Sequence, residues 1–134
     1  INIQPIWPLA CSKLVFLALV EPHVNCSTPT NAKRGRDAVL LCHLEPQSDA
    51  RKYTIEWKFK NLIPHVYRSG KDDVHSADSN YKGRTSLINV EKGNISLKLL
   101  NATKADEGNY TCYVQQLPRQ FRKCNVTLNV GELH

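Results

Sequence analysis

The sequence lacks the residue patterns on which most enzymes and cofactor-binding proteins depend. Its 134 residues include six glycines but no glycine-rich phosphate loop. The five histidines are scattered, with no nucleophile or acidic partner at a useful spacing. Asp72 and Asp73 are the only adjacent pair of aspartates, and they are interpreted as a solvated turn. The chain is therefore predicted to be no enzyme and to bind no cofactor and no metal.

The cysteines also lack the spacing of a metal or redox centre. There is no CxxC pair and no histidine at zinc-ligand spacing among Cys11, Cys26, Cys42, Cys112 and Cys124. Five triplets match the N-glycosylation acceptor pattern, at Asn25, Asn94, Asn101, Asn109 and Asn125. Disulfides and repeated acceptors together indicate a glycoprotein of the secretory pathway, located at the cell surface or secreted.

No apolar stretch approaches the about 20 residues that cross a bilayer, so any membrane anchor is expected outside this chain. The apolar run at residues 14–20 follows Lys13 and resembles the end of a signal peptide. Residues 1–25 are therefore predicted to be a signal-peptide remnant or an amino-terminal extension, and an ordinary first strand is the alternative. Residues 26–131 are assigned to one domain, a size that buries an ordinary core, and residues 132–134 to a tail.

The chain has no run of five basic residues, although its formal net charge is +6. An excess of positive charge attracts nucleic acid, anionic lipid or acidic glycans. Without a basic run or a basic stripe interleaved with aromatics, a solvated basic surface is the favoured interpretation. No nucleic-acid partner is predicted.

What the sequence does contain is a series of short alternating runs. From Cys26 onward they are broken by turn residues every 8 to 12 positions or so, which is typical of an all-β sandwich. The run "YTIEWKFK" places Ile55, Trp57 and Phe59 on one face and charged residues on the other. The sequence therefore predicts strands and no helices of note.

One constellation identifies the sandwich. Cys42 and Cys112 lie 70 residues apart, and Trp57 follows the first cysteine by 15. A disulfide joining two sheets beneath a tryptophan is the core of an immunoglobulin fold. We predict a Cys42–Cys112 bridge, which would stabilise the fold by about 4 kcal/mol according to the chain-entropy argument. Tyr110, two residues before Cys112, occupies the position of the tyrosine corner.

Two further core residues refine this prediction. Arg84 and Asp106 are placed to form an ion pair that closes the bottom of the sandwich. The interval between Trp57 and Arg84 leaves room for two additional edge strands. The predicted fold is a variable-type (V-set) β-sandwich of about nine antiparallel strands in a Greek key.

The segments "HVYRSGKDD" and "YKGRTSLINVEKGNISLKLLNATKADEGNYTC" resemble the first domain of the butyrophilin and myelin-oligodendrocyte glycoprotein family. The resemblance covers roughly residues 27–130. It implies a cell-surface ectodomain that binds a counter-receptor on T cells and modulates T-cell receptor signalling and cytokine production. The alternative is a homophilic or heterophilic adhesion module, with self-association. A rearranging antigen receptor is disfavoured because "VTLNV" ends without a Gly-x-Gly joining motif.

Cys26 and Cys124 fall outside the minimum pattern of that family. In this topology the first and last strands begin at the same end of the sandwich, so a second disulfide, Cys26–Cys124, is predicted. A Cys11–Cys124 bridge and two free cysteines are the alternatives.

The partner-binding surface is predicted on the sheet that carries the last strands and on the loop tips. The predicted contact residues are Lys58, Arg68, Tyr113, Gln115, Leu117 and Arg119. Tyr113 is the strongest candidate because aromatic side chains carry much of the energy of interfaces, and its alternative role is to cover a neighbouring strand. Asn109 and Asn125 share this face, so sugars on both would restrict the partner to the loops and the opposite edge.

Overall fold

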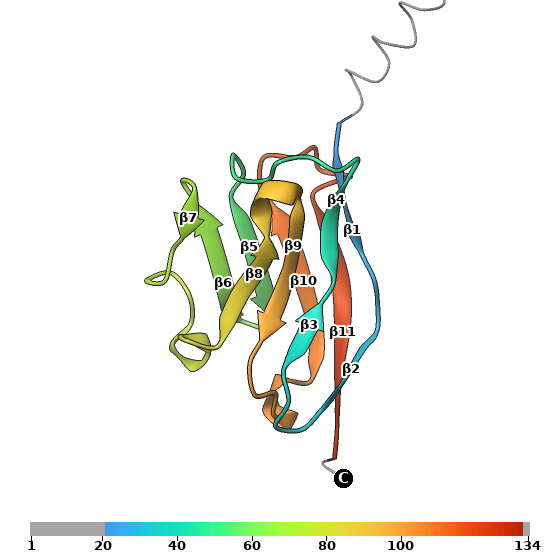
Figure 1. Ribbon diagram of the computed structural model, residues 1–134, viewed down its shortest axis with the longest axis vertical. Coiled ribbons are helices and arrows are strands. Elements are labelled where there is room, and N and C mark those ends of the chain that lie inside the picture. Colours follow the sequence, from blue (N-terminus) through green and yellow to red (C-terminus); the bar gives the residue numbers. More distant parts are fainter. Residues whose placement is uncertain (1–20, 133–134) are drawn as a thin grey trace, which may run out of the picture.

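The computed structural model describes residues 21–132, which form two β-sheets packed face to face (Figure 1). Sheet A has the strand order β1-β4-β9-β3, with β8 also paired to β9, and sheet B has the order β2-β11-β10-β5-β6-β7. Sheet A contains β1 (His23–Cys26), β3 (Ala38–Leu40), β4 (Cys42–Glu45), β8 (Thr85–Asn89) and β9 (Asn94–Leu99). Sheet B contains β2 (Thr30–Lys33), β5 (Ile55–Phe59), β6 (Leu62–Arg68), β7 (Lys71–Asp72), β10 (Gly108–Val114) and β11 (Lys123–Gly131).

Three short 3-10 helices lie in the connections: η1 (Ser79–Tyr81), η2 (Val90–Lys92) and η3 (Lys104–Asp106). Over residues 21–132, no helix is both long and apolar enough to cross a membrane. Cys11 and the apolar run at residues 14–20 lie outside the described residues, as does most of the predicted tail.

The predicted all-β sandwich is confirmed, and residues 21–132 contain eleven strand segments where about nine are predicted. The predicted pairing is wholly antiparallel, but β2 runs parallel to β11. The alternating stretch "DAVLLCHL" is divided at Leu41 into β3 and β4. There the hydroxyl of Ser96 accepts a bond from the Cys42 amide at 2.9 Å and donates to the Cys42 carbonyl at 3.2 Å. A side chain that satisfies both backbone groups replaces the usual ladder at this point.

The first strand begins earlier than the predicted domain boundary at residue 26. β1 starts at His23, and Val24 is buried in the core. The Val24 amide donates to the carbonyl of Phe121 at 2.9 Å, so this strand contacts the start of β11 as well as β4. Residues 23–25, which the sequence assigned to the extension, therefore belong to the folded domain.

The core lies between the inward faces of the two sheets. Trp57 is fully buried beside its register partner Cys112, and its indole nitrogen donates to the carbonyl of Ile95 in the opposite sheet at 3.0 Å. The rings of Phe59 and Tyr110 are stacked, with centroids 4.2 Å apart. The Trp57 bond joins sheet B to sheet A, and the Phe59–Tyr110 stack packs two neighbouring strands of sheet B together.

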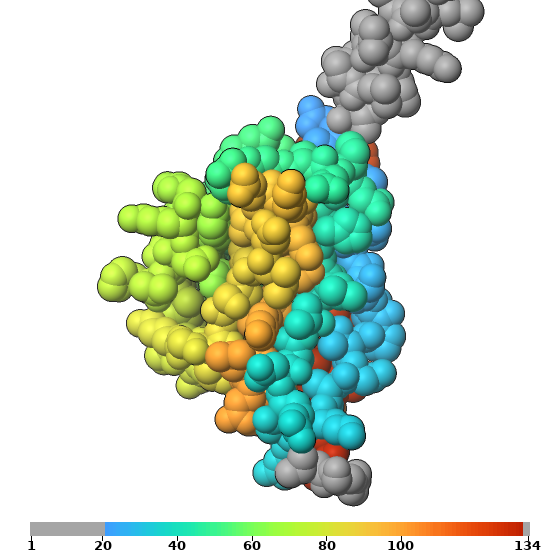
Figure 2. Space-filling view, viewed as in Figure 1, coloured from blue at the N-terminus to red at the C-terminus, as the bar shows by residue number. Residues whose placement is uncertain are grey.

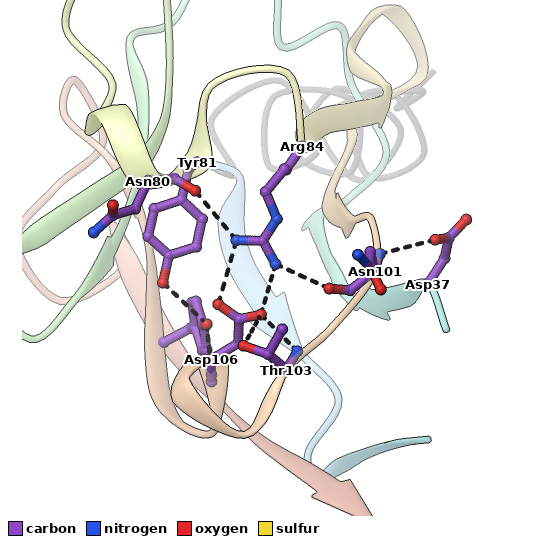
Figure 3. A network of polar contacts seen from close by, with 8 residues as sticks. Asp37, Asn80, Tyr81, Arg84, Asn101, Thr103 and Asp106 are labelled. Carbon is purple, nitrogen blue, oxygen red and sulfur yellow. Dashed lines mark hydrogen bonds and ion pairs between the residues drawn. The ribbon is translucent and has the colours of Figure 1, made fainter. Parts of the chain in front are cut away.

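A polar network closes the lower end of the sandwich (Figure 3). Arg84 donates to the carboxylate of Asp106 at 2.7 Å, and Asp106 is buried. The same carboxylate accepts from the amide and hydroxyl of Thr103 at 2.9 and 3.2 Å. The Tyr110 hydroxyl donates to the Asp106 carbonyl at 2.6 Å, which is the tyrosine-corner contact, and burial raises the pKa of Tyr110. The ion pair and the corner that the sequence indicates are thus one connected unit.

Four cysteines meet at one level between the sheets. Cys26 is the register partner of Cys42, and Cys112 is the register partner of Cys124. Cys26 and Cys124 form a disulfide, with 5.8 Å between their α-carbons. This is the second bridge predicted from the sequence, and it joins an edge strand of sheet A to sheet B.

The structure differs from the sequence prediction for the other pair. Among residues 21–132, Cys42 and Cys112 are unbonded thiols, and both are fully buried. The Cys42 sulfur lies 3.7 Å from the Cys124 sulfur, which is a non-bonded contact with the Cys26–Cys124 disulfide, since a disulfide bond is roughly 2.05 Å long. Burial and the neighbouring Cys42 thiol raise the pKa of Cys112.

A Cys42–Cys112 bridge therefore stays a prediction for the oxidised protein. We expect protein from the secretory pathway to carry it, because Cys112 faces Cys42 in a compartment that favours disulfides. Unfolding with an alkylating agent and no reductant, followed by peptide mass spectrometry, should leave Cys26, Cys42, Cys112 and Cys124 untagged. Tags on Cys42 and Cys112 alone would contradict the bridge.

Candidate functional site

The connection between β10 and β11, residues 115–122, is held in place at its first half by Thr54. The Gln115 amide donates to the Thr54 carbonyl at 3.0 Å. The Gln116 side chain accepts from the Thr54 amide at 2.8 Å and donates to the Thr54 hydroxyl at 3.1 Å. We call this segment the β10–β11 loop; three hydrogen bonds fix its start to the residue before β5.

Leu117 anchors the loop from inside. It was predicted to contact a partner, but the structure buries it in the core, so that prediction is wrong. The chain turns after β10, with the Leu117 amide donating to the Val114 carbonyl at 3.4 Å. This turn ends the alternation of the strand and directs the leucine inward.

The second half of the loop is held by β1 and by the disulfide. The carbonyl of Phe121 accepts from Val24, and the carbonyl of Arg122 accepts from Val114 at 2.7 Å. Cys124, bonded to Cys26, lies two residues further along. The loop therefore has hydrogen bonds at both ends and a covalent bond at its base.

The tip of the loop is exposed and carries Arg119, Gln120 and Phe121. The Phe121 side chain is 37% exposed, and its ring centroid lies 6.2 Å from that of His23. Sequence reasoning did not select Phe121. The signal available was the single aromatic residue of the segment, two residues after the arginine that was selected.

Tyr113 lies on the outer face of sheet B, below the loop, and is only half-buried. Its ring is flanked by two cations, the Lys58 ammonium at 4.6 Å and the Arg122 guanidinium at 5.2 Å from the centroid. Gln115 donates to the carboxylate of Glu56 on the same face. The structure thus brings Lys58, Tyr113 and Gln115 together on one surface, as predicted.

Arg68 is not part of this surface. It ends β6, beside the short edge strand β7, and pairs with Asp73 at 2.8 Å and with the Ser76 hydroxyl at 3.0 Å. Hydrogen bonds from Ser76, followed by the charge of Arg68, lower the pKa of Asp73. The arginine contributes to a local loop contact at the far edge of the sheet.

The arrangement of sulfur atoms does not supply a metal centre. The sulfur atoms of Cys26, Cys42 and Cys124 lie within 4.8 Å of one another. Two of them are bonded to each other in the disulfide, which leaves Cys42 as the one thiol of the three. A structural zinc site needs about four such ligands.

Comparison with known protein families identifies the type of domain that carries these features. Residues 26–131 match the immunoglobulin V-set domain family. The chain belongs to the V-set family. In a V-set domain the counterpart of the β10–β11 loop is the connection between the last two strands, one of the loops at the end of the sandwich that antibodies use for recognition.

Individual relatives support the resemblance to butyrophilins. The V-set chain is 37% identical to mouse butyrophilin-like protein 2 over 93 residues, which covers 66% of this chain and 20% of that protein. It is 31% identical to mouse V-set domain containing T-cell activation inhibitor 1 over 121 residues, 86% of this chain and 43% of the relative. The crystal structure of bovine butyrophilin superposes with a TM-score of 0.75 at 25% identity, covering 85% of this chain and 56% of that one. The chain therefore spans less than half the length of either mouse relative.

The glycosylation acceptors fall on both outer faces of this V-set domain. On sheet A, Asn25 and Asn94 are each paired with His43, so they lie two strands apart. Strands β3, β4, β8 and β9 of this sheet face the viewer in Figure 2. On sheet B, Asn109 and Asn125 are exposed, and the Thr111 hydroxyl donates to the Asn125 side chain at 2.8 Å. Asn101 lies in an exposed turn with φ of 52°.

Proposed function

We propose that this V-set domain is the ectodomain of a cell-surface or secreted protein that binds a counter-receptor on T cells. Through that contact it would modulate T-cell receptor signalling and cytokine production. Support comes from its similarity to butyrophilins and to a mouse protein named as a T-cell activation inhibitor. V-set membership and receptor-like relatives point to binding and not to catalysis.

The observation that carries the proposal is the fixed β10–β11 loop. A loop that is ordered before binding loses less conformational entropy when a partner docks, so more of the contact energy appears as affinity. Its tip presents Phe121 and Arg119, and aromatic and arginine side chains are enriched among the residues that dominate interface energies. The buried Leu117 keeps that tip in place.

Replacing both tip residues, Phe121→Ala with Arg119→Ala, is expected to weaken binding of the tagged protein to activated T cells by about 30-fold or more. This corresponds to the loss of at least one residue that contributes about 2 kcal/mol. Flow cytometry with a concentration series of the protein would measure the change.

The matched control is Ile88→Ala, which removes a comparably exposed apolar side chain, 44% exposed, from β8 in the opposite sheet. Its binding should equal that of the unmodified protein. Equal loss in both variants would contradict a contact at the β10–β11 loop. Absence of T-cell staining, together with self-association in the ultracentrifuge, would reject the proposal in favour of an adhesion module.

A further inference from the structure

The outer face of sheet B contains a groove of about 370 Å³ whose lining includes none of the loop-tip residues. Its lining consists of Lys58, Lys60, Asn109, Thr111, Tyr113 and Lys123. The three lysines come from strand β5, the residue that follows it, and strand β11, on either side of the central strand β10. We call this feature the lysine groove.

The lysines of the groove are not neutralised by the protein. Within residues 21–132, none of the three has a carboxylate within 4.0 Å, whereas eight arginine, lysine or histidine residues elsewhere do, for example Arg84 and Lys104. Glu56 is the acidic group on the adjoining part of the face, and it accepts a bond from Gln115. Arg122 adds a further cation at the upper end, over the Tyr113 ring.

The register fixes how these charges are spaced. Lys58 pairs with Thr111, and Lys123 pairs with Tyr113, so the two lysines flank β10 with an offset of two residues. With strands roughly 4.8 Å apart and a rise of roughly 3.4 Å per residue, their backbones are separated by about 10 to 12 Å. Lysine side chains spread over this distance present a row of point charges, and not a single pocket for one anion.

The chemistry of the lining favours a polar polyanion over a protein surface. The groove contains no aliphatic side chain apart from the lysine stems, and its other members are an amide, a hydroxyl and a tyrosine. Protein–protein interface cores are depleted of lysine and depend on apolar anchors. A chain that carries repeated sulfate and carboxylate groups needs instead the charges and hydrogen-bond donors that are present here.

We infer that the lysine groove binds a sulfated glycosaminoglycan. This would be a second binding activity, separate from the protein contact proposed for the β10–β11 loop. The groove would attach the domain to the glycans of the cell surface or matrix, while the loop tip stays available. Because Asn109 lines the groove, a sugar on that residue would fill it and prevent binding.

The test uses the full chain, secreted from mammalian cells, with heparin as the immobilised probe. In about 0.15 M salt, the triple variant Lys58→Ser, Lys60→Ser, Lys123→Ser should bind heparin on the order of 100-fold more weakly, because each lysine near an anionic surface contributes several-fold. The slope of log Kd against log salt should also fall by about three units. Desulfated heparin should fail to bind the unmodified protein.

The matched control removes the same charge from exposed lysines outside the groove, with Lys33→Ser, Lys82→Ser and Lys92→Ser. It should retain nearly all of the affinity. Equal loss in both triple variants, or no heparin binding by unmodified protein whose Asn109 carries no sugar, would overturn the inference. Heparinase removes the glycosaminoglycan from the cells. If the groove variant then stains T cells more weakly than the unmodified protein does, the inference is overturned and an acidic protein is indicated as the occupant of the groove.

A second readout needs no substitution. Glycopeptide mass spectrometry of the heparin flow-through and eluate should find the Asn109 sugar enriched in the flow-through. Eluted protein with Asn109 fully occupied would contradict the placement of the site. The variant with Phe121→Ala and Arg119→Ala should bind heparin normally, so failure of the counter-receptor proposal and failure of this one are distinguishable.

Discussion

Replacing Asp106 with asparagine is expected to lower the free energy of unfolding by about 3 kcal/mol. The substitution keeps the shape of the side chain but removes the charge that balances Arg84, whose guanidinium also donates to the carbonyls of Asn80 and Asn101. Breaking a buried pair by removing one partner leaves the other charge uncompensated. Breaking a buried ion pair usually costs about 3 to 5 kcal/mol. The lower value applies here because the Arg84 side chain is 26% exposed. Urea unfolding followed by circular dichroism would measure it.

Glu132→Gln provides the matched control for this measurement. It makes the same change from carboxylate to amide in the exposed pair that Glu132 forms with Arg34 at 3.8 Å. Exposed pairs of this kind contribute little, so the unfolding midpoint should not move. An unchanged midpoint in Asp106→Asn as well would show that the corner network does not stabilise the sandwich.

Removing the Cys26–Cys124 bridge with the double variant Cys26→Ala, Cys124→Ala is expected to cost about 4 kcal/mol. The bridge closes a loop with a sequence separation of 98, and cross-links that span long loops restrict the unfolded chain most. The same change should weaken T-cell binding, because the β10–β11 loop loses the covalent bond at its base. Chemical unfolding without reductant would give the first effect and flow cytometry the second.

Cys11→Ala tests the pairing directly. It is the same substitution at a cysteine outside the described residues, and it should leave both stability and binding unchanged. A loss of stability in Cys11→Ala equal to that in the double variant would mean that Cys124 is bonded to Cys11.

The sandwich fold could be predicted because a few residues with specific chemistry lie in a characteristic order and spacing along the chain. Trp57, Arg84 and Tyr110 each have one role that this sandwich offers to their residue type, and their order along the chain is enough to assign it. The Cys26–Cys124 bridge followed from the topology implied by that fold. These inferences depend on spacing along the chain and not on how loops fold.

The details of the binding surface could not be predicted, because side-chain direction in a loop depends on its turns. Leu117 was a predicted contact residue because it lies in the segment between Cys112 and Cys124. The turn after Val114 directs Leu117 into the core and leaves Phe121 at the tip. The lysine groove could not be predicted either. Lys58 and Lys123 are far apart in sequence, and the register of three strands brings them to one groove.

The Cys26–Cys124 bridge has a consequence for how the domain responds to proteases. Every loop between these two cysteines, which includes almost the whole domain, lies inside a single covalent ring. One cut at an exposed loop, such as the segment around Val74, opens the ring but leaves the two pieces bonded to each other. The nicked domain can then keep both halves of its sheets in register, and a fragment is released only after a second cut or after reduction.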